Sequence, residues 1–320
     1  HRLSGEIVPQ GAKNEALQII CATLLTPSKI TISNIPDIRD VNKLIFILGE
    51  LGVKIDKLDS NTYAFQADDL NLDYLESLQF KKDGSSLRGS IMIVGPLLTR
   101  FGKGYIPRPG GDKIGRRRLD THFEGFMKLG AKFRYNREEH FFGVEARKLK
   151  GTHMLLDEAS VTGTANIIMA AVLAEGTTTI YNAACEPYIQ QLCKLLNKMG
   201  ARIFGAGTDT IRIEGVERLF GTDYRVLPDR IETGTYLVAA AMTGGRIKVT
   251  GTRTGASEYR RKIGVWPHVR STGDRRIEPH HQPAPFGRPV EAQRHLKAGG
   301  DQQQHRVFAV LGGQPQPPEA

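Results

Sequence analysis

The sequence predicts an α/β protein built from repeated units of about 70 to 80 residues. Three segments share a glycine followed by strand-forming residues, and they lie 78 and 70 residues apart, at 51–55, 129–133 and 199–203. Apolar residues recur at helical spacing before each segment. Each unit is therefore expected to contain a helix, a glycine at its C-terminal end and a strand.

The glycine of each segment (Gly52, Gly130 and Gly200) is suited to a helix C-cap, because glycine adopts the left-handed conformation without steric cost. The helices before these glycines are predicted from apolar residues three or four positions apart: Val41, Leu44, Ile45 and Leu48; Leu119, Phe123, Phe126 and Met127; Ile189, Leu192, Cys193 and Leu196.

Short strands are predicted upstream of these helices, at 29–34, 104–107, 178–182 and 246–251. An alanine- or leucine-rich apolar helix precedes three of them, as at 167–174. A fourth unit begins near Leu237. Its pattern stops at about residue 254.

Residues 254–320 lack helical or strand periodicity and are rich in arginine, histidine, glutamine, proline and glycine. One interpretation is a natural disordered tail, which has this kind of composition. The other is a change of reading frame near Arg253, which is favoured because the break falls inside a structural unit. The chain begins at His1 without a signal-peptide pattern, so the true start is expected to be missing.

Length and composition predict a two-domain protein, because 320 residues exceed what one hydrophobic core usually supports. The sequence has no long apolar run, so no membrane span is expected. Three cysteines at spacings that fit neither a zinc site nor a disulfide framework indicate a reducing compartment, hence the cytoplasm. The formal charge of +10 indicates an anionic partner: nucleic acid, an anionic lipid surface or a phosphorylated small molecule.

Lys13 is a candidate anion-binding residue. It lies in a Gly-Ala-Lys-Asn motif between a short strand at 5–8 and an apolar helix at 16–25. The exposed amides and dipole of a helix N-terminus favour an anion, and lysine adds a full charge. The alternative is a solvated lysine at a turn.

The segment 104–122 is a candidate lid, because Gly110 and Gly111 permit backbone motion and a run of arginines follows at 116–118. Arginine matches phosphate and carboxylate oxygens with two parallel hydrogen bonds. The alternative is a basic, solvated face at a helix start. Two further candidates are the hydroxyl-rich segment 160–166, which would otherwise simply cap its helix, and Arg88, which would otherwise be an ordinary ion-pair partner.

These motifs, in this order, resemble the UDP-N-acetylglucosamine enolpyruvyl transferases. The resemblance runs from about Gly5 to Val249, and the Asn-Ala-Gly-Thr-Ala hallmark of the sister shikimate-pathway enzymes is absent. The matching motifs lie at 11–14, 87–91, 95–98, 100–102, 109–115, 173–178, 182–184, 207–209, 213–219 and 225–235.

The resemblance implies a two-domain fold, an inside-out α/β barrel of βαβαββ units, with substrates bound between the domains. The first domain would span 11–220, a partial second domain would comprise 1–10 and 221–253, and 254–320 would match neither.

The implied reaction transfers the enolpyruvyl group of phosphoenolpyruvate to the 3-hydroxyl of UDP-N-acetylglucosamine in peptidoglycan precursor synthesis. Lys13, Asn14 and Arg117 would bind phosphoenolpyruvate, with Lys13 and Arg117 balancing its charge. Position 158 is lysine in some members of the family. The residues facing the nucleotide sugar would be Arg88, Arg117, Arg118, Leu119, Asp120, Thr121, Glu158, Ala159, Ser160 and Val161.

Asp112 takes the loop position at which the family usually has a catalytic cysteine. The residue there is a general acid that protonates the methylene carbon of phosphoenolpyruvate, and a carboxylic acid can donate that proton. A carboxylate is a far poorer nucleophile than a thiolate, so fosfomycin, which alkylates the cysteine, is expected to fail. Without the resemblance, Asp112 would be a turn residue after two glycines.

Two other functions remain open. The first is a catalytically inactive fragment that binds UDP-sugar weakly. It stays open because the family's proton-abstracting aspartate and a further arginine lie beyond the matching region. A nucleic-acid-binding protein is disfavoured, because aromatic residues are not interleaved with the basic clusters. No cofactor, metal ion, nucleic acid or membrane partner is expected, and the oligomeric state is left open.

Overall fold

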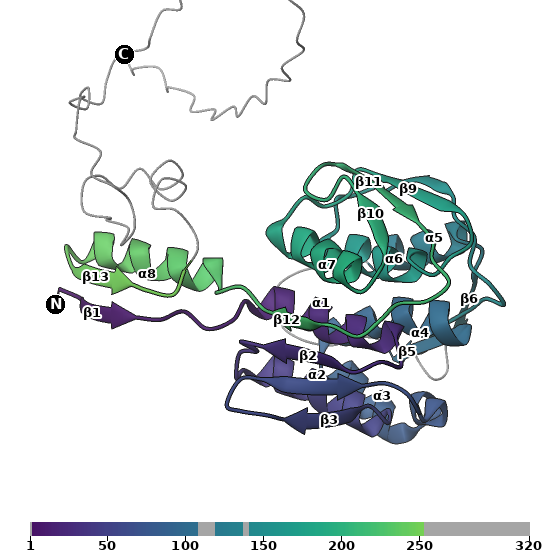
Figure 1. Ribbon diagram of the computed structural model, residues 1–320, viewed down its shortest axis with the longest axis horizontal. Helices are drawn as coiled ribbons and strands as arrows, with labels where there is room; N and C mark the ends of the chain where they lie inside the picture. Colours follow the sequence, from purple (N-terminus) through teal and green to yellow (C-terminus); the bar gives the residue numbers. More distant parts are fainter. Residues whose placement is uncertain (1, 108–118, 137–140, 253–320) are drawn as a thin grey trace, which may run out of the picture. The chain divides into compact units, whose positions relative to one another are not determined.

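The computed structural model describes residues 2–107, 119–136 and 141–252. The chain divides into two units, His1–Ser271 and Thr272–Ala320, and every described residue belongs to the first unit. Helices and strands alternate along the described residues (Figure 1), which confirms the predicted α/β class. The tail and the glycine loop lie outside the described residues.

The three predicted helix–glycine–strand segments are confirmed. Gly52, Gly130 and Gly200 have φ angles of 101°, 96° and 103°, in the left-handed region that glycine adopts at a helix end. The helices are α2 (Arg39–Glu50), α5 (Asp120–Lys128) and α7 (Pro187–Lys198). The strands after the glycines are β3 (Lys54–Lys57), β6 (Lys132–Asn136) and β10 (Arg202–Phe204).

The upstream elements also lie where the sequence predicts them. The strands are β2 (Ile30–Ser33), β5 (Lys103–Pro107), β9 (Thr177–Tyr181) and β13 (Arg246–Val249). The helices before them are α1 (Lys13–Ala22), α4 (Val94–Phe101), α6 (Val161–Ala171) and α8 (Arg230–Met242). Between the first two units lie α3 (Leu78–Ser85) and the 3-10 turns η2 (Leu72–Glu76) and η3 (Arg88–Ile93), and η1 (Thr23–Leu25) follows α1.

The first and third units form sheets of the same pattern. In the third, β8 (His153–Leu155) is parallel to β9, and β11 (Thr210–Glu214) and β10 follow antiparallel. In the first, β12 (Asp223–Arg225) is parallel to β2, and β4 (Tyr63–Gln66) and β3 follow antiparallel. The chain therefore returns after the third unit to complete the sheet of the first (Figure 1).

The middle sheet has three strands, β5, β7 (Phe141–Glu145) and β6, in the order β5-β7-β6 within the described part of the chain. All five residues of β6 are exposed. By contrast, eight of the ten residues of α1 and nine of the eleven residues of α6 are buried. A helix buried on all sides belongs to a core, so α1 and α6 lie inside whereas β6 lies at the surface.

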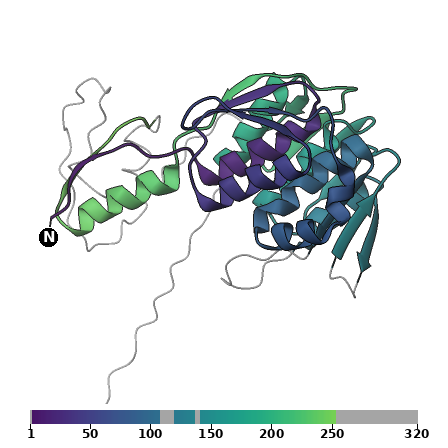
Figure 2. The ribbon, with the colours of Figure 1, turned by 90° about the horizontal axis from the view of Figure 1, so that it is seen from below.

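The core is one continuous cluster that includes residues from all three units. Its largest fully buried side chains include Phe65, Phe80 and Phe126. Figure 2 shows α1 beside α2, an arrangement in which the amphipathic α2 covers one side of the buried helix.

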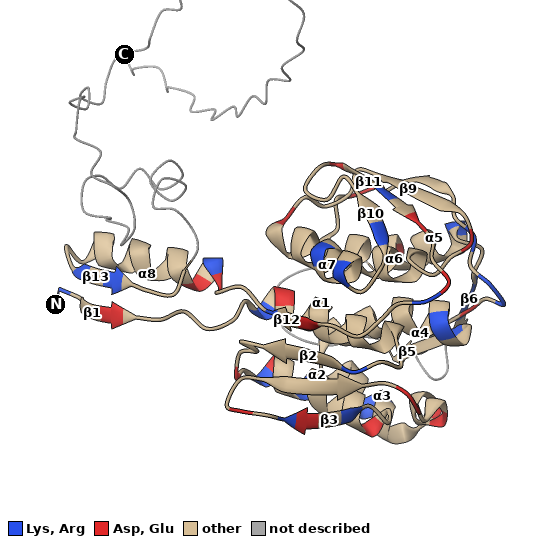
Figure 3. Ribbon diagram, viewed as in Figure 1, with Lys and Arg blue, Asp and Glu red and all other residues tan. Residues whose placement is uncertain are grey.

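The fourth unit is made of α8, β13 and β1 (Ser4–Ile7). Strand β1 pairs in parallel with β13, from Ser4 opposite Arg246 to Ile7 opposite Val249. The structure describes every residue of α8, and Thr233 is the one it buries. Charged residues gather at the start of α8, and the remainder of the helix carries none (Figure 3). The assignment of these elements to a partial second domain stays a prediction.

Candidate functional site

Lys13 is the first residue of α1, as the helix-start prediction required. Its Nζ atom lies 2.6 Å from Oδ2 of Asp40, and the two side chains are 45% and 42% exposed. An ion pair this exposed adds little to stability, because water screens it. The lysine is therefore accessible to a competing anion at a helix N-terminus.

Lys13 and Asn14 line a cavity of about 470 Å³. The other wall is the beginning of α8, with Asp229, Ile231, Glu232, Thr235 and Tyr236. This volume is within the range of small-molecule sites. The structure thus places two of the three predicted phosphoenolpyruvate residues on one cavity, with the polar start of α8 opposite them.

Asp229 links the two helices that border this cavity through hydrogen bonds. Its Oδ1 atom accepts hydrogen bonds from the amides of Ile231 (2.7 Å) and Glu232 (3.1 Å), which caps α8. Its Oδ2 atom accepts one from the amide of Lys13 at 3.3 Å, at the start of α1. The sequence analysis assigned Asp229 no role. An aspartate before an apolar helical stretch is an N-cap signal, so the cap of α8 was predictable, whereas the bond to Lys13 was not.

Glu15, in the first turn of α1, is a second polar residue that the sequence analysis missed. Its side chain is 2% exposed, and its Oε1 atom accepts hydrogen bonds from the amide of Leu227 (3.0 Å) and the hydroxyl of Tyr224 (3.1 Å). Burial raises the pKa of Glu15 to about 7, despite these hydrogen bonds. The residue joins α1 to the segment that leads from β12 to α8.

Replacing Glu15 with glutamine is expected to stabilise the protein at pH 8. The folded state holds the Glu15 proton more tightly than the unfolded chain, whose pKa is near 4.5, so stability falls as the pH rises from about 4.5 to 7. The penalty above pH 7 is about 3 kcal/mol at 1.36 kcal/mol per pKa unit. Glutamine keeps an acceptor oxygen and removes the charge.

Thermal melting of both proteins at pH 4.5 and pH 8 measures this effect. The variant should melt higher at pH 8, and the gain should vanish at pH 4.5. Glu124→Gln, at an exposed position of α5, is the matched control and should change neither midpoint appreciably. A difference between Glu15→Gln and the wild type that is the same at both pH values would contradict the prediction.

The predicted nucleotide-sugar residues lie at the starts of η3, α5 and α6. Arg88 begins η3, Asp120 begins α5 directly after Leu119, and Val161 begins α6. The hydroxyl of Thr121 donates to Asp157 (3.2 Å) and to Glu158 (3.3 Å). The structure therefore joins the start of α5 to the segment before α6.

The hydroxyl of Ser160 accepts a hydrogen bond from the amide of Gly163 at 3.2 Å, which caps α6. This confirms the capping role considered for the 160–166 segment. Ala159, next to Ser160, is exposed. Asp112, Arg117 and Arg118, together with the rest of the glycine loop, lie outside the described residues, so their roles stay predictions.

Within 2–107, 119–136 and 141–252, no group of three or more His, Cys, Asp or Glu side chains is placed to hold a metal ion. In the same ranges, no helix is both long and apolar enough to cross a membrane. Cys21, Cys185 and Cys193 are free thiols.

The profile of the family EPSP synthase (3-phosphoshikimate 1-carboxyvinyltransferase) matches residues 1–264. The chain is 62% identical over 249 residues to a Bacteroides fragilis protein named UDP-N-acetylglucosamine 1-carboxyvinyltransferase, covering 78% of this chain and 57% of the relative. A Porphyromonas gingivalis protein of the same name is 58% identical over 247 residues, covering 77% and 57%. The chain thus spans about 57% of the length of these relatives.

Two solved structures are similar in fold. EPSP synthase from Acinetobacter baumannii has a TM-score of 0.64 at 19% identity, covering 82% of this chain and 60% of that structure. The enolpyruvyl transferase NikO from Streptomyces tendae has a TM-score of 0.60 at 19% identity, covering 74% and 55%. At these identities the likeness shows the fold alone.

Proposed function

Because this chain belongs to the EPSP synthase family, we propose that it transfers the enolpyruvyl group of phosphoenolpyruvate to the 3-hydroxyl of UDP-N-acetylglucosamine, releasing phosphate. Its fold is the α/β fold of the enolpyruvyl transferases. The identity of 58 to 62% with relatives named UDP-N-acetylglucosamine 1-carboxyvinyltransferase is the observation that carries the choice of substrates. The reaction would take place in the cytoplasm and supply peptidoglycan precursors. It would thereby contribute to cell shape and cell division.

The position of Lys13 supports this proposal, and the carboxylates of Asp229 and Glu232 line the other side of the same cavity. Both substrates are anionic, and Lys13 is an accessible cation at a helix N-terminus on a cavity of about 470 Å³. Lys13 and Arg117 would neutralise the charge of phosphoenolpyruvate. The starts of η3, α5 and α6 would hold the nucleotide sugar.

Asp112 would protonate the methylene carbon of phosphoenolpyruvate, which makes the neighbouring carbon open to attack by the sugar hydroxyl. The sugar hydroxyl gives its proton to a base as its oxygen bonds to that carbon. A proton then leaves the new methyl group as the bond to phosphate breaks, which restores the double bond and releases phosphate. Because Asp112 is a carboxylate rather than a thiolate, resistance to alkylation by fosfomycin belongs to the same proposal.

The second candidate is a catalytically inactive chain that binds UDP-sugar weakly. The span of about 57% of the relatives' length is the observation that favours it. In this case Arg88, Thr121 and their neighbours would still contact the nucleotide, without turnover of the bound substrate.

Phosphate release in the presence of both substrates distinguishes the two candidates. The full chain is expected to release phosphate only when both are present, and Lys13→Met should reduce the rate by about 100-fold or more, as the loss of a positioned charge does. Lys29→Met is the control, since Lys29 is also surface-exposed and paired, 3.6 Å from Asp56.

The possible results distinguish the two candidates and test the role of Lys13. Binding of UDP-N-acetylglucosamine without any phosphate release would establish the inactive-chain alternative. Neither binding nor release would contradict both candidates. A loss of rate in Lys29→Met equal to that in Lys13→Met would contradict the role of Lys13.

A further inference from the structure

Asn166 lies in α6, is 0% exposed, and connects three other segments through its side chain. Its Oδ1 atom accepts a hydrogen bond from the amide of Gly95 in α4 at 2.8 Å. Its Nδ2 atom lies 2.8 Å from the carbonyl oxygen of Ile91 in η3 and 3.0 Å from Nδ1 of His122 in α5. The amide is therefore a buried junction of four elements.

The chemistry of these partners fixes the protonation of His122. The amide N–H of Gly95 can only donate and the carbonyl of Ile91 can only accept, so the orientation of the Asn166 amide is determined. Nδ2 must then donate to Nδ1 of His122, which leaves Nδ1 without a proton. The neutral ring carries its proton on Nε2, which donates to the Thr162 hydroxyl at 3.2 Å.

The surroundings keep this ring neutral. His122 is 1% exposed, and burial, together with the positive charge of Arg88, lowers its pKa to about 3. A protonated ring would also direct an N–H group at Nδ1 against the N–H group of Asn166. Burial and charge therefore favour the neutral ring, and the hydrogen bonds select its Nε2–H tautomer.

The joined segments are those that carry the predicted nucleotide-sugar residues. Ile91 follows Arg88 in η3, His122 follows Thr121 in α5, and Asn166 follows Val161 in α6. The bonds from Thr121 to Asp157 and Glu158 join two of the same segments on the other side. Packing adds to this: a Cβ atom on Gly163 would lie 2.9 Å from Cγ2 of Thr121.

We propose that Asn166 and the neutral His122 are positioning residues that hold the starts of η3, α5 and α6 in the register needed to bind UDP-N-acetylglucosamine. This inference rests on the proposed function for its ligand. The pair acts through the segments that it joins, because a buried side chain with fixed hydrogen bonds preorganises the residues beside it.

The first test is the tautomer of His122, read from the ¹⁵N shifts of the labelled imidazole at pH 7. The wild type is expected to show a proton on Nε2 and none on Nδ1. Asn166→Asp removes both donors and places a carboxyl oxygen against Nδ1, so the proton should move to Nδ1 or the ring should become charged. Protonated Nδ1 in the wild type, or an unchanged spectrum in the variant, would overturn the proposal.

The second test is the dissociation constant of UDP-N-acetylglucosamine measured by calorimetry. Asn166→Asp is expected to weaken binding by about ten-fold or more, because small displacements of binding groups have effects of this size. Asn197→Asp is the matched control: the amide of Asn197 bonds both the N–H and the C=O of Ile203 at 2.9 Å, in a different part of the fold.

The control should lose stability but retain its affinity. Equal losses of affinity in the two variants would reduce Asn166 to a general structural role and overturn the proposal. If Asn166→Asp does not fold, the affinity of Asn166→Ser for the nucleotide sugar and the tautomer of His122 in the wild type decide the question. A wild-type chain that does not bind the nucleotide sugar would refute the proposed function and the ligand named here, while the ¹⁵N spectra would still show whether the pair exists.

Discussion

Gly95→Ala is expected to destabilise the protein by roughly 3 to 5 kcal/mol, the sum of overpacking and a lost buried hydrogen bond. Alanine is otherwise the better helix former by about 1 kcal/mol. At Gly95, however, a Cβ atom would lie 2.4 Å from the carbonyl oxygen of Asn166 and 2.5 Å from its Oδ1. Neither atom can retreat easily, because one is backbone and the other accepts the Gly95 amide at 2.8 Å.

Gly49→Ala provides the matched comparison, because Gly49 also lies inside a helix, α2. The nearest atom to its Cβ would be Cδ1 of Ile55 at 3.8 Å, an ordinary contact. This variant should be neutral or more stable by up to about 1 kcal/mol. Urea denaturation followed by circular dichroism measures both, and similar stability changes in the two variants would refute the steric argument.

The repeated units could be predicted from the sequence because their signals are local. A glycine that ends a helix, such as Gly52, is recognised from the residues beside it, and its positive φ follows from chain geometry. The pairing of β12 with β2 could not be predicted in this way. Asp223 lies opposite Thr31 in that pair, and a strand of three residues carries too little pattern to identify its partner.

In the candidate site, too, local motifs could be predicted whereas contacts between distant residues could not. Lys13 and Asn14 were found from a motif at a helix start, and the structure places them on one cavity. The contribution of Asp229 to that cavity depends on a hydrogen bond to the Lys13 amide, between residues far apart in the chain. From the sequence, His122 is only the last residue of the candidate lid at 104–122, because hydrogen bonds to Asn166 and Thr162, rather than any local pattern, define its state.

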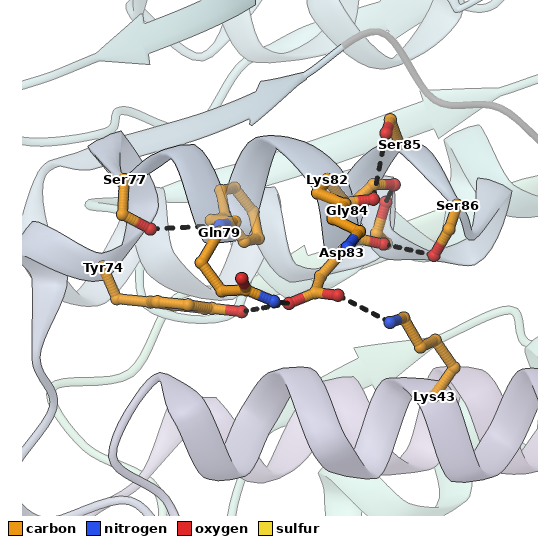
Figure 4. Close-up of polar contacts among 11 residues, drawn as sticks. Lys43, Tyr74, Ser77, Gln79, Lys82, Asp83, Gly84, Ser85 and Ser86 are labelled. Atoms are coloured by element: carbon orange, nitrogen blue, oxygen red, sulfur yellow. Dashed lines mark hydrogen bonds and ion pairs between the residues drawn. The ribbon is translucent and has the colours of Figure 1, made fainter.

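Figure 4 shows a buried carboxylate in α3, that of Asp83, with its polar partners. Asp83 is 3% exposed, and its carboxylate accepts hydrogen bonds from Nζ of Lys43 (2.6 Å), Nε2 of Gln79 (2.7 Å) and the hydroxyl of Tyr74 (3.3 Å). Burial alone would raise the pKa of Asp83, but these hydrogen bonds outweigh it and hold the pKa below its usual value. The carboxylate is therefore ionised and needs its donors.

The same helix packs against the end of β5. A Cβ atom on Gly84 would lie 2.9 Å from Cγ of Pro107, the residue at which β5 ends before the loop. The hydroxyl of Ser90 in η3 donates to the carbonyl of Gly84 at 2.8 Å. Asp83 therefore holds in place a helix that contacts both the end of β5 and the segment that begins at Arg88.

Lys43→Met is expected to destabilise the protein by about 2 kcal/mol, because it leaves a buried carboxylate without its cation. The value is below the 3 to 5 kcal/mol typical of a fully buried pair, since the Lys43 side chain is itself 32% exposed. Lys54→Met tests the burial argument. The Lys54–Asp68 pair has a similar length, 2.8 Å, but its side chains are 63% and 30% exposed, so its loss should change stability by about 0.5 kcal/mol or less.

Urea denaturation at pH 7 and at pH 3 measures the predicted difference and its origin. The pKa of Asp83 is lowered in the folded state, so its contribution is present above the unfolded value of 3.8 and is lost as the pH falls further. The destabilisation by Lys43→Met should accordingly shrink as the pH falls toward 3, because a buried Asp83 that has lost Lys43 takes up a proton more readily and then no longer needs a cation. If Lys43→Met and Lys54→Met destabilise equally at pH 7, burial does not determine the strength of these pairs. The stabilisation of α3 by the Lys43–Asp83 pair would then be contradicted.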